Sequence, residues 1–401
     1  MIRLLLSAFS EYPKLDTGGA NKIILQILQH LDRNSFCAAY HSCHFSKKFS
    51  NQSQITHQIY ASLKFKKKIG SNLFLKNHFI RGILSSPFYL NRYLRKCNEI
   101  FENLLSMSDY DVLHSHDIRT IYYLQKFNFR KKILTIHSKG SLLNDLRYYS
   151  GSISTDLLYK YSKMENESLI ISDLITFPSM AAKYLFLNEK NIPVEENKIR
   201  IVYNGVDLDY INSIFPDEDF RKKYSIPSGY DFILINIADH IRVKNIDIAL
   251  KIVEYLNRAH KVRALLINAG HGPETVNLKR LSYQLKISDR VIFLGRLPYD
   301  EIIKLIKVGD FLISTADKVV FDLAILEALA SGVLVIASDC GGNKEVIKNN
   351  INGFLIKDFQ VEEYGNVIIN SDVKIRMNIS ESVKNFSVQK MVDGYQDLYE
   401  L

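Results

Sequence analysis

The sequence predicts an α/β protein with two doubly wound domains, each built on a parallel sheet. Short apolar segments alternate with helix-forming segments along the whole chain. The apolar segments form two series, and a stretch that holds Pro216, Pro227, Ser228 and Gly229 separates them. A chain of 401 residues is long enough to bury two cores. We therefore expect domains over residues 1–205 and 206–385.

The predicted strands are short runs of apolar residues bounded by polar residues or glycine. The first series covers residues 2–7, 112–114, 133–136 and 174–177, and residues 21–31 form one of the helices between them. The second series covers residues 232–237, 264–269, 291–294, 311–314 and 333–337. Strands joined through helices run parallel, and open parallel sheets bind ligands at the carboxyl ends of their strands.

Composition favours a globular protein of the cytoplasm. Apolar residues make up 47% of the chain and charged residues 24%. The apolar run at the amino terminus is too short for a secretory signal, and no run approaches the ~18 to 20 apolar residues that cross a bilayer. Cys37, Cys43, Cys97 and Cys340 include no C-x-x-C pair, so we expect reduced thiols and neither a zinc site nor a disulfide framework.

Positive charge is concentrated in the first half of the chain. Residues 1–190 hold 26 Lys and Arg against 14 Asp and Glu, a balance of +12 in a chain whose net charge is +9. The basic runs at residues 64–68 and 92–96 are interleaved with aromatic residues. Such runs are solvated faces, membrane-binding surfaces or nucleic-acid sites. Because no nucleic-acid module accompanies them, we favour an anionic membrane surface on the inner face of the cytoplasmic membrane and expect no nucleic-acid partner.

The segment 309–347 carries the strongest functional signal. It contains a strand, a helix over residues 321–330, a second strand and the turn Asp339-Cys340-Gly341-Gly342. Glu327 is the one acidic residue within the apolar run of that helix. A carboxylate in this position is either part of a solvated face or a binder of hydroxyl groups.

Further candidates follow other predicted strands. Gly18 and Gly19 precede a helix, where they form either a plain turn or a loop that lets the backbone approach a phosphate. Lys244 follows the first strand of the second series and is a surface residue or a phosphate ligand, with Arg242 as a second cation. His114, His116 and His137 lie at strand ends as structural residues or site residues, and His116-Asp117 also raises the possibility of a metal.

These motifs resemble those of the family 4 retaining glycosyltransferases (group 1) of GT-B fold. The run from Leu326 to Gly332 matches half of the family's Glu-x7-Glu signature, and the stretch from Ser338 to Glu345 matches its Asp-x-Gly-Gly turn. Segments 198–207, 269–274, 288–295 and 386–395 resemble further family segments. The chain departs from the pattern at Val319, where the family has its first glutamate. Val320 and Asp322 replace glycines, and Asp239 replaces an arginine.

The resemblance implies two Rossmann-like domains facing across a cleft and a last helix, residues 386–401, that packs back on the first domain. It assigns His137, Lys244 and Arg242 to catalysis: the histidine faces the transferred sugar, and the cations neutralise the leaving diphosphate. The implied donor contacts are Gly18, Gly19, His116, Asn204, Gly270, Asp322, Glu327, Gly341 and Gly342. It implies no cofactor and no metal.

The function implied is the transfer of a hexose-type sugar, with retention of configuration, from a UDP- or GDP-sugar. The expected acceptor is a bacterial cell-surface glycan of the lipopolysaccharide, O-antigen or capsule type, either free or linked to lipid. Two alternatives stay open. One is a sugar-nucleotide epimerase of the same architecture, and the other is a non-catalytic sugar-nucleotide-binding protein whose donor site is degenerate, as Val319 and Asp239 suggest.

Overall fold

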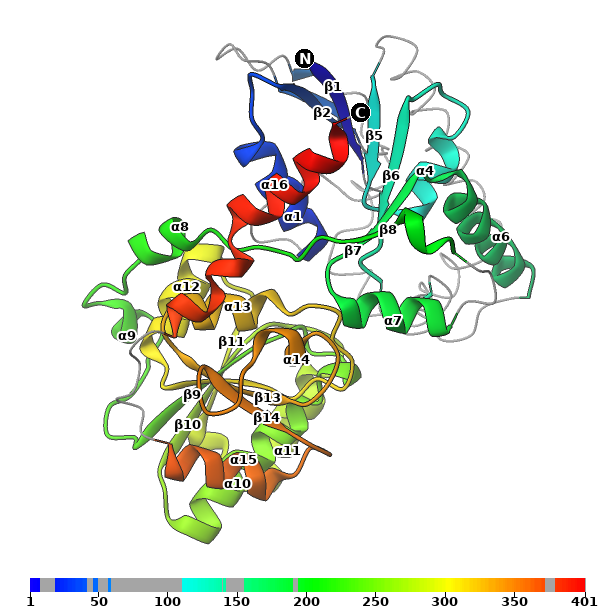
Figure 1. Ribbon diagram of the computed structural model, residues 1–401. Helices are drawn as coiled ribbons and strands as arrows, with labels where there is room; N and C mark the ends of the chain where they lie inside the picture. Colours follow the sequence, from blue (N-terminus) through cyan, green and yellow to red (C-terminus); the bar gives the residue numbers. More distant parts are fainter. Residues whose placement is uncertain are drawn as a thin grey trace. The chain divides into compact units, whose positions relative to one another are not determined.

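A computed structural model describes residues 1–7, 19–41, 46–49, 57–58, 110–138, 140–141, 155–189, 194–371 and 379–400 (Figure 1). It divides into two compact units, a first unit of Met1–Tyr203 with Met391–Leu401 and a second unit of Asn204–Lys390. The first break lies two residues before the predicted boundary after residue 205, and the second lies five residues after residue 385. Both units have the α/β architecture that the alternating sequence pattern predicts.

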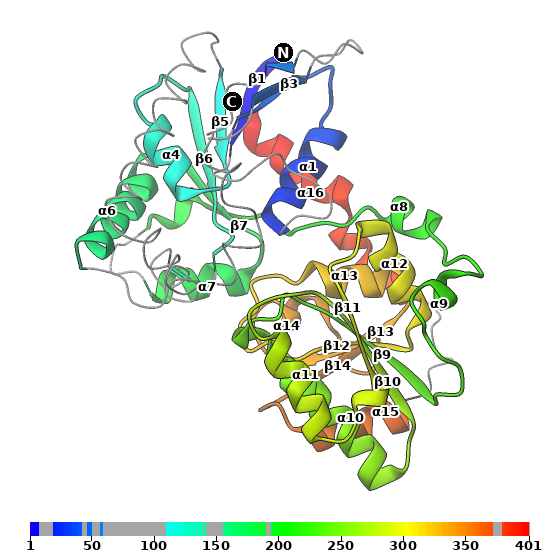
Figure 2. The same ribbon diagram turned by 180° about the vertical axis from the view of Figure 1, so that it is seen from behind.

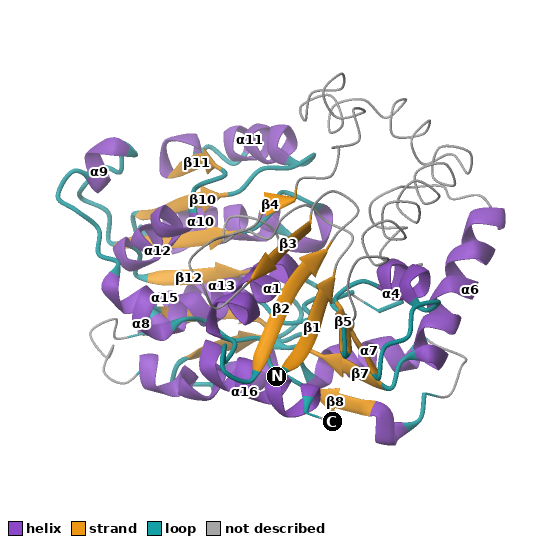
Figure 3. Cartoon of the chain, turned by 90° about the horizontal axis from the view of Figure 1, so that it is seen from above, coloured by secondary structure: helices purple, strands orange, loops and turns teal. Residues whose placement is uncertain are grey.

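The first unit contains an eight-stranded sheet in the order β4-β3-β2-β1-β5-β6-β7-β8. Its strands are β1 (Ile2–Ser7), β2 (Phe36–His41), β3 (Ser46–Phe49), β4 (His57–Gln58), β5 (Val112–Ser115), β6 (Lys131–Thr135), β7 (Leu174–Phe177) and β8 (Ile199–Ile201). Strands β2, β1, β5, β6, β7 and β8 run parallel, and β3 and β4 add an antiparallel edge. Figure 3 shows β1 and β2 side by side, in the register that pairs Ile2 with Phe36.

The described helices of the first unit follow its strands. They are α1 (Gly19–His30), α4 (Ile118–Leu124), α6 (Thr155–Ile171), α7 (Met180–Asn188) and the short η1 (Glu196–Lys198), joined by α16 (Val388–Tyr399) from the end of the chain. Helix α16 lies beside α1 in Figure 1 and Figure 2. Its Tyr399 packs edge-on against Phe36, with ring centroids 5.8 Å apart, and its Gln396 accepts a hydrogen bond from the backbone of Asp32 (2.8 Å). The last residues of the chain therefore complete the core of the first unit.

The second unit contains a six-stranded, fully parallel sheet in the order β11-β10-β9-β12-β13-β14. Its strands are β9 (Phe232–Ile237), β10 (Ala264–Ala269), β11 (Val291–Gly295), β12 (Phe311–Ser314), β13 (Leu334–Ser338) and β14 (Gly353–Ile356). Strands β10, β12 and β13 are buried along their whole length, which explains their nearly continuous apolar sequences.

Helices cover both faces of this second sheet. They are α8 (Leu208–Ser213), α9 (Phe220–Lys223), η2 (Arg242–Lys244), α10 (Ile246–His260), α11 (Thr275–Gln284), η3 (Ser288–Arg290), α12 (Tyr299–Val308), α13 (Leu323–Ala330), α14 (Asn343–Val346), α15 (Val361–Asn370) and η4 (Ser380–Phe386). Helices α10, α11 and α15 gather on one face, and α8, α12 and α13 gather on the other (Figure 1). This is the doubly wound arrangement expected from the sequence.

Candidate functional site

The second sheet has a switch point between β9 and β12. Strands β10 and β11 are added on one side of β9, and β12, β13 and β14 are added on its other side. The loops that follow these two strands are joined there by hydrogen bonds. The hydroxyl of Thr315 donates to the carbonyl oxygens of Lys244 (3.0 Å) and Asn245 (2.9 Å), and the N–H of Asp317 donates to Val243 (3.1 Å). Open α/β sheets bind their ligands at such a point, so these loops form the candidate site of the second unit.

Lys244 and Asp322, two of the predicted site residues, meet at this switch point. The Lys244 Nζ lies 3.4 Å from the Asp322 Oδ2, and the two side chains are 21% and 13% exposed. The Asp322 Oδ1 accepts a hydrogen bond from the backbone of Ala324 (3.2 Å) and so caps the start of α13. The carboxylate is therefore held in place by the helix as well as by the lysine.

Two arginines near this point are more exposed than Lys244. Arg242 begins the same short helix as Lys244, but its side chain is 94% exposed and lies 3.7 Å from Glu274. Asp239, which stands where the family has an arginine, pairs instead with Arg296 from the loop after β11 (2.9 Å). Sequence reasoning did not identify Arg296, and its place directly after Gly295 at the end of a predicted strand was the available signal.

The glycines of the Gly341-Gly342 turn are required by close backbone contact. A Cβ atom at Gly341, whose φ is +50°, would lie 1.9 Å from the carbonyl oxygen of Val319, and one at Gly342 would lie 2.3 Å from that of Val320. The N–H of Gly342 donates to the Val319 oxygen (3.2 Å). The side chain of Val319 itself is only 5% exposed. Position 319 therefore contributes backbone to this turn, and its side chain belongs to the core.

Glu327 is 4% exposed on α13, so its interpretation as part of a solvated face is wrong. Burial raises the pKa of the Tyr299 hydroxyl far above its usual range, and the neighbouring Glu327 carboxylate raises it further. The Tyr299 ring stacks on Tyr210 of α8, with centroids 6.2 Å apart. A buried carboxylate in a helix this apolar matches the hydroxyl-binding interpretation better than the solvated one.

A buried polar network fixes the loop that contains Gly270. The His240 Nδ1 lies 2.7 Å from the Thr275 hydroxyl oxygen, and the His240 Nε2 is hydrogen-bonded to the Asn268 Oδ1. The Asn268 side-chain amide donates to the Asn236 Oδ1 (2.9 Å). A Cβ atom at Gly270, whose φ is +153°, would lie 1.8 Å from the carbonyl oxygen of Ala238. The loops after β9 and β10 are thus in direct backbone contact. No periodic pattern predicts this network, because its members come from three separate segments of the chain.

In the first unit, three histidines gather at the carboxyl ends of β5 and β6. The His116 Nδ1 lies 2.9 Å from the His137 Nε2, and the two rings stack with centroids 5.2 Å apart. The rings of His114 and His116 have centroids 4.2 Å apart. His116 is 6% exposed, and its Nε2 is buried without a hydrogen-bond partner. A buried polar atom without a partner among the described residues is unusual and marks this cluster as a candidate site.

The environment of these histidines keeps them neutral. Burial lowers the pKa of His137 to about 4, and burial together with the nearby His137 lowers the pKa of His114 to about 3. The pKa of His116 is also well below its usual range, because of burial first and then because of the other two imidazoles. At neutral pH the cluster can donate and accept hydrogen bonds without carrying charge.

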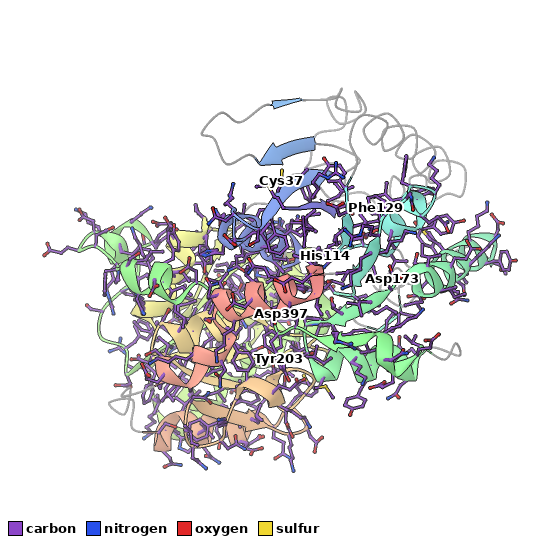
Figure 4. All side chains as sticks on the ribbon, turned by 45° about the horizontal axis from the view of Figure 1, so that its top comes forward. Cys37, His114, Phe129, Asp173, Tyr203 and Asp397 are labelled. Carbon is purple, nitrogen blue, oxygen red and sulfur yellow. The ribbon has the colours of Figure 1, made fainter. Side chains whose placement is uncertain are left out.

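Helix α16 contacts His114, the most deeply buried of the three histidines, which Figure 4 labels. The hydroxyl of Tyr399 lies 2.6 Å from the His114 Nδ1, and the Thr135 hydroxyl lies 2.6 Å from the His114 Nε2. His114 is fully buried within β5, one residue before the strand ends. Its partner Tyr399 was missed at the sequence level, although Tyr395 and Tyr399 recur at helical spacing on the buried side of α16.

The remaining predicted site residues lie apart from these clusters or outside the described residues. Gly19 is the first residue of α1, whereas Gly18 and the basic runs at 64–68 and 92–96 lie outside the described residues. Asn204 is the first residue of the second unit, is 5% exposed and has a buried Oδ1 without a hydrogen-bond partner.

Neither a metal cluster nor a membrane span is found in the part of the chain that the structure describes. No three His, Cys, Asp or Glu side chains gather there in a way that could hold a metal ion. Asp117, next to His116, caps α4 and pairs with Arg119 (2.6 Å). Among the described helices, none combines the length and apolar character needed to cross a bilayer.

Two family models match the chain. The model described as Glycosyltransferase Family 4 matches residues 17–210, and the model described as Glycosyl transferases group 1 matches residues 216–383. The two matches meet near the division between the units.

Similar curated proteins include glycosyltransferases of several organisms. N-acetyl-alpha-D-glucosaminyl L-malate synthase of Bacillus anthracis is 29% identical over 57% of this chain and 59% of its own length. UDP-Gal:alpha-D-GlcNAc-diphosphoundecaprenol alpha-1,3-galactosyltransferase of Escherichia coli is 26% identical over 52% of this chain and 56% of its own. The chain thus spans under two thirds of the length of each of these relatives.

Solved structures share the fold over almost the full length. Sucrose-phosphate synthase of Thermosynechococcus elongatus has a TM-score of 0.73 at 18% identity, covering 100% of this chain and 98% of its own. Anabaena HepE in complex with UDP and glucose has a TM-score of 0.67 at 17% identity, covering 100% of both chains. These similarities establish the GT-B fold.

Proposed function

This chain belongs to the family 4 glycosyltransferases (group 1) of GT-B fold, and we propose that it transfers a sugar from a nucleotide-sugar donor to an acceptor hydroxyl with retention of configuration. The second unit binds the nucleoside diphosphate, and the histidines of the first unit act on the transferred sugar. The activity is proposed for the chain as a whole, since the curated relatives are matched over only part of their length.

The observation that carries this proposal is the position of Lys244. It stands at the switch point of a parallel sheet, in a loop tied to the loop after β12, with the buried Glu327 on the helix that follows. A lysine there neutralises a diphosphate as negative charge develops on it. A buried carboxylate nearby accepts hydrogen bonds from ribose hydroxyls, which are among the strong hydrogen bonds because the acceptor is charged.

The reaction then proceeds by breaking the bond between the anomeric carbon of the sugar and the diphosphate oxygen. The bond to the acceptor oxygen forms on the face that the diphosphate leaves, and the acceptor proton passes to a phosphate oxygen. The electron pair of the broken bond stays with the diphosphate, where Lys244 stabilises it. His137, neutral at pH 7, donates or accepts a hydrogen bond to the sugar. No metal and no cofactor takes part in this proposal.

The proposed donor is a UDP- or GDP-hexose, and the proposed acceptor is a cell-surface glycan of the lipopolysaccharide, O-antigen or capsule type, free or lipid-linked. The acceptor class draws support from the name of the E. coli relative, which acts on a diphosphoundecaprenol-linked sugar. A lipid-linked acceptor would also suit the basic first half of the chain, which we propose attaches peripherally to the inner face of the cytoplasmic membrane.

The test is calorimetric titration with UDP, GDP, ADP and dTDP against the full chain and two variants. We expect at least one nucleotide to bind. Lys244→Ala and Glu327→Ala should each weaken that binding by about 10-fold or more, because each removes a charged hydrogen-bonding partner worth ~1.5 to 3 kcal/mol.

Lys251→Ala provides the matched control. Lys251 lies on α10 in the same unit and pairs with Asp247 one turn away (2.8 Å), at 47% exposure. Its removal should leave nucleotide affinity unchanged. Equal affinity of the wild type and both site variants for every nucleotide would remove the donor-site assignment.

A further inference from the structure

Three cations on the carboxyl-edge loops of the second sheet pair with carboxylates from other segments of the chain. Arg242 pairs with Glu274, Arg296 with Asp239 and Lys244 with Asp322. The first two pairs have strongly exposed arginines and contribute little, because water and salt screen them. The third is the most enclosed, with both side chains under a quarter exposed. It bridges the loop after β9 and the start of α13, beside the switch point.

The side chains of Lys244 and Asp322 differ in conformational freedom. Asp322 has a short side chain, and its second oxygen is tied to the N–H of Ala324 at the start of α13. Lys244 carries its charge on a flexible four-carbon stem. Its backbone is fixed by the Thr315 hydroxyl, and its side chain is 21% exposed. An anion that arrives at this loop therefore moves the lysine and leaves the aspartate where it is.

We propose that Asp322 is an internal counter-ion that competes with the diphosphate of the substrate for Lys244. Asp322 holds the ammonium group when no nucleotide is bound, loses it when the diphosphate binds, and recovers it as the nucleoside diphosphate leaves. The inference rests on the proposed function and goes beyond it, because it gives Asp322 a role opposite to that of a donor ligand. The fixed negative charge weakens anion binding and so favours product release.

The charges of Asp322 and Lys244 also act on the Cys340 thiol. Its thiol lies in the turn after β13 and donates to the carbonyl of Ala316 (3.1 Å). Burial raises the pKa of this thiol, and the carboxylates of Asp317 and Asp322 raise it further, whereas Lys244 lowers it. The reactivity of Cys340 therefore reports on the balance between Asp322 and Lys244 without any nucleotide.

The test uses Asp322→Asn, which removes the charge and keeps an oxygen for the Ala324 N–H. Binding of UDP, GDP and inorganic pyrophosphate to the full chain is measured by calorimetry. We expect each anion that binds the wild type to bind the variant about 3- to 10-fold more tightly, as expected for loss of one partly screened like charge. Alkylation of Cys340 at pH 8, followed by mass spectrometry of its peptide, should become faster in the variant.

Asp217→Asn is the matched control, since Asp217 pairs with Lys304 on α12 in the same unit (3.1 Å) and away from these loops. It should change neither affinity nor Cys340 reactivity. Unchanged or weaker anion binding in Asp322→Asn overturns the counter-ion role. Weaker binding confined to UDP or GDP, with pyrophosphate unaffected, would make Asp322 a ligand of the nucleoside instead. Failure of the wild type to bind any of the anions would refute the proposed function itself.

Discussion

At the scale of single residues, the contact between His116 and His137 defines the role that we propose for the first unit in sugar transfer. The two rings stack and share a hydrogen bond at the carboxyl ends of β5 and β6. His137 is partly exposed, whereas His116 is almost fully buried behind it. We infer that His137 meets the substrate and that His116 fixes the orientation of its ring.

Substitution of His137 separates its catalytic role from its structural one. His137→Ala removes the partner of the His116 Nδ1, so it should lower both turnover and stability, the latter by about 1 kcal/mol. His137→Gln keeps a hydrogen-bonding side chain toward His116, so its melting temperature should stay close to that of the wild type. Both should lower turnover by about 10²-fold, as expected for a positioned hydrogen-bonding group. Full turnover of the glutamine variant would mean that His137 has a structural role only.

The lowered pKa values make stability depend on pH in a defined direction. His114 has a pKa of about 3 in the folded protein and about 6.5 when unfolded, so the unfolded chain binds protons first. The free energy of unfolding should therefore fall as pH drops below 6.5, by about 2 kcal/mol for such a histidine between pH 7 and pH 5. Urea unfolding at the two pH values measures this loss. His114→Gln should show a smaller drop, and a pH-independent wild type would contradict the buried neutral imidazole.

At the scale of elements, the turn after β13 is held by contact between two backbones. Gly341→Ala would drive its Cβ into the Val319 carbonyl, which forces the turn away from the loop that leads into α13. We expect a loss of stability of about 2 to 3 kcal/mol, together with weaker nucleotide binding.

Gly332 supplies the control for backbone strain. It too has a positive φ, +74°, but a Cβ there would meet nothing within 4 Å. Gly332→Ala should therefore cost only about 1 kcal/mol, the strain of the left-handed backbone, and leave nucleotide binding intact. Similar melting temperatures for the two variants in thermal denaturation would mean that the Gly341 turn can shift to accommodate a Cβ without loss of stability, which would contradict this account.

The strands show which elements can be predicted from sequence. The predicted ranges 174–177, 232–237, 264–269 and 311–314 coincide with β7, β9, β10 and β12, because buried parallel strands are apolar runs with polar ends. Strands β2, β8 and β14 were not predicted: β8 has only three residues, and β14 is an edge strand that is only partly buried. The edge strands β3 and β4 carry no apolar run at all.

The site was predictable where it depends on strand ends and unpredictable where it depends on loop contacts. Lys244 and Asp322 were both identified, and the topology brings them together. Their pairing with each other, and that of Asp239 with Arg296, depends on loop conformations that no periodic pattern encodes. The bond between His114 and Tyr399 joins residues far apart in sequence, so local patterns could not have predicted it.

At the scale of the whole molecule, the proposed attachment to a membrane rests on the distribution of charge along the chain. The excess positive charge of residues 1–190 predicts binding to vesicles that contain anionic lipid. Sedimentation with such vesicles should fall as salt rises, because charges more than about 8 Å apart are screened at physiological ionic strength. Vesicles of neutral lipid serve as the control. Absence of binding to anionic vesicles even at low salt would make the charge a solvated face only.

The proposed glycosyl transfer is tested most directly by the fate of the donor when methanol replaces the natural acceptor. The full chain is incubated with UDP-, GDP-, ADP- and dTDP-hexoses, and the products are identified by NMR. We predict slow release of one nucleoside diphosphate and a methyl glycoside with the anomeric configuration of the donor, both lost in Lys244→Ala. A change in the sugar's ring stereochemistry without methyl glycoside would indicate an epimerase. Nucleotide binding without consumption of any donor would indicate a binding protein, and either result would contradict glycosyl transfer.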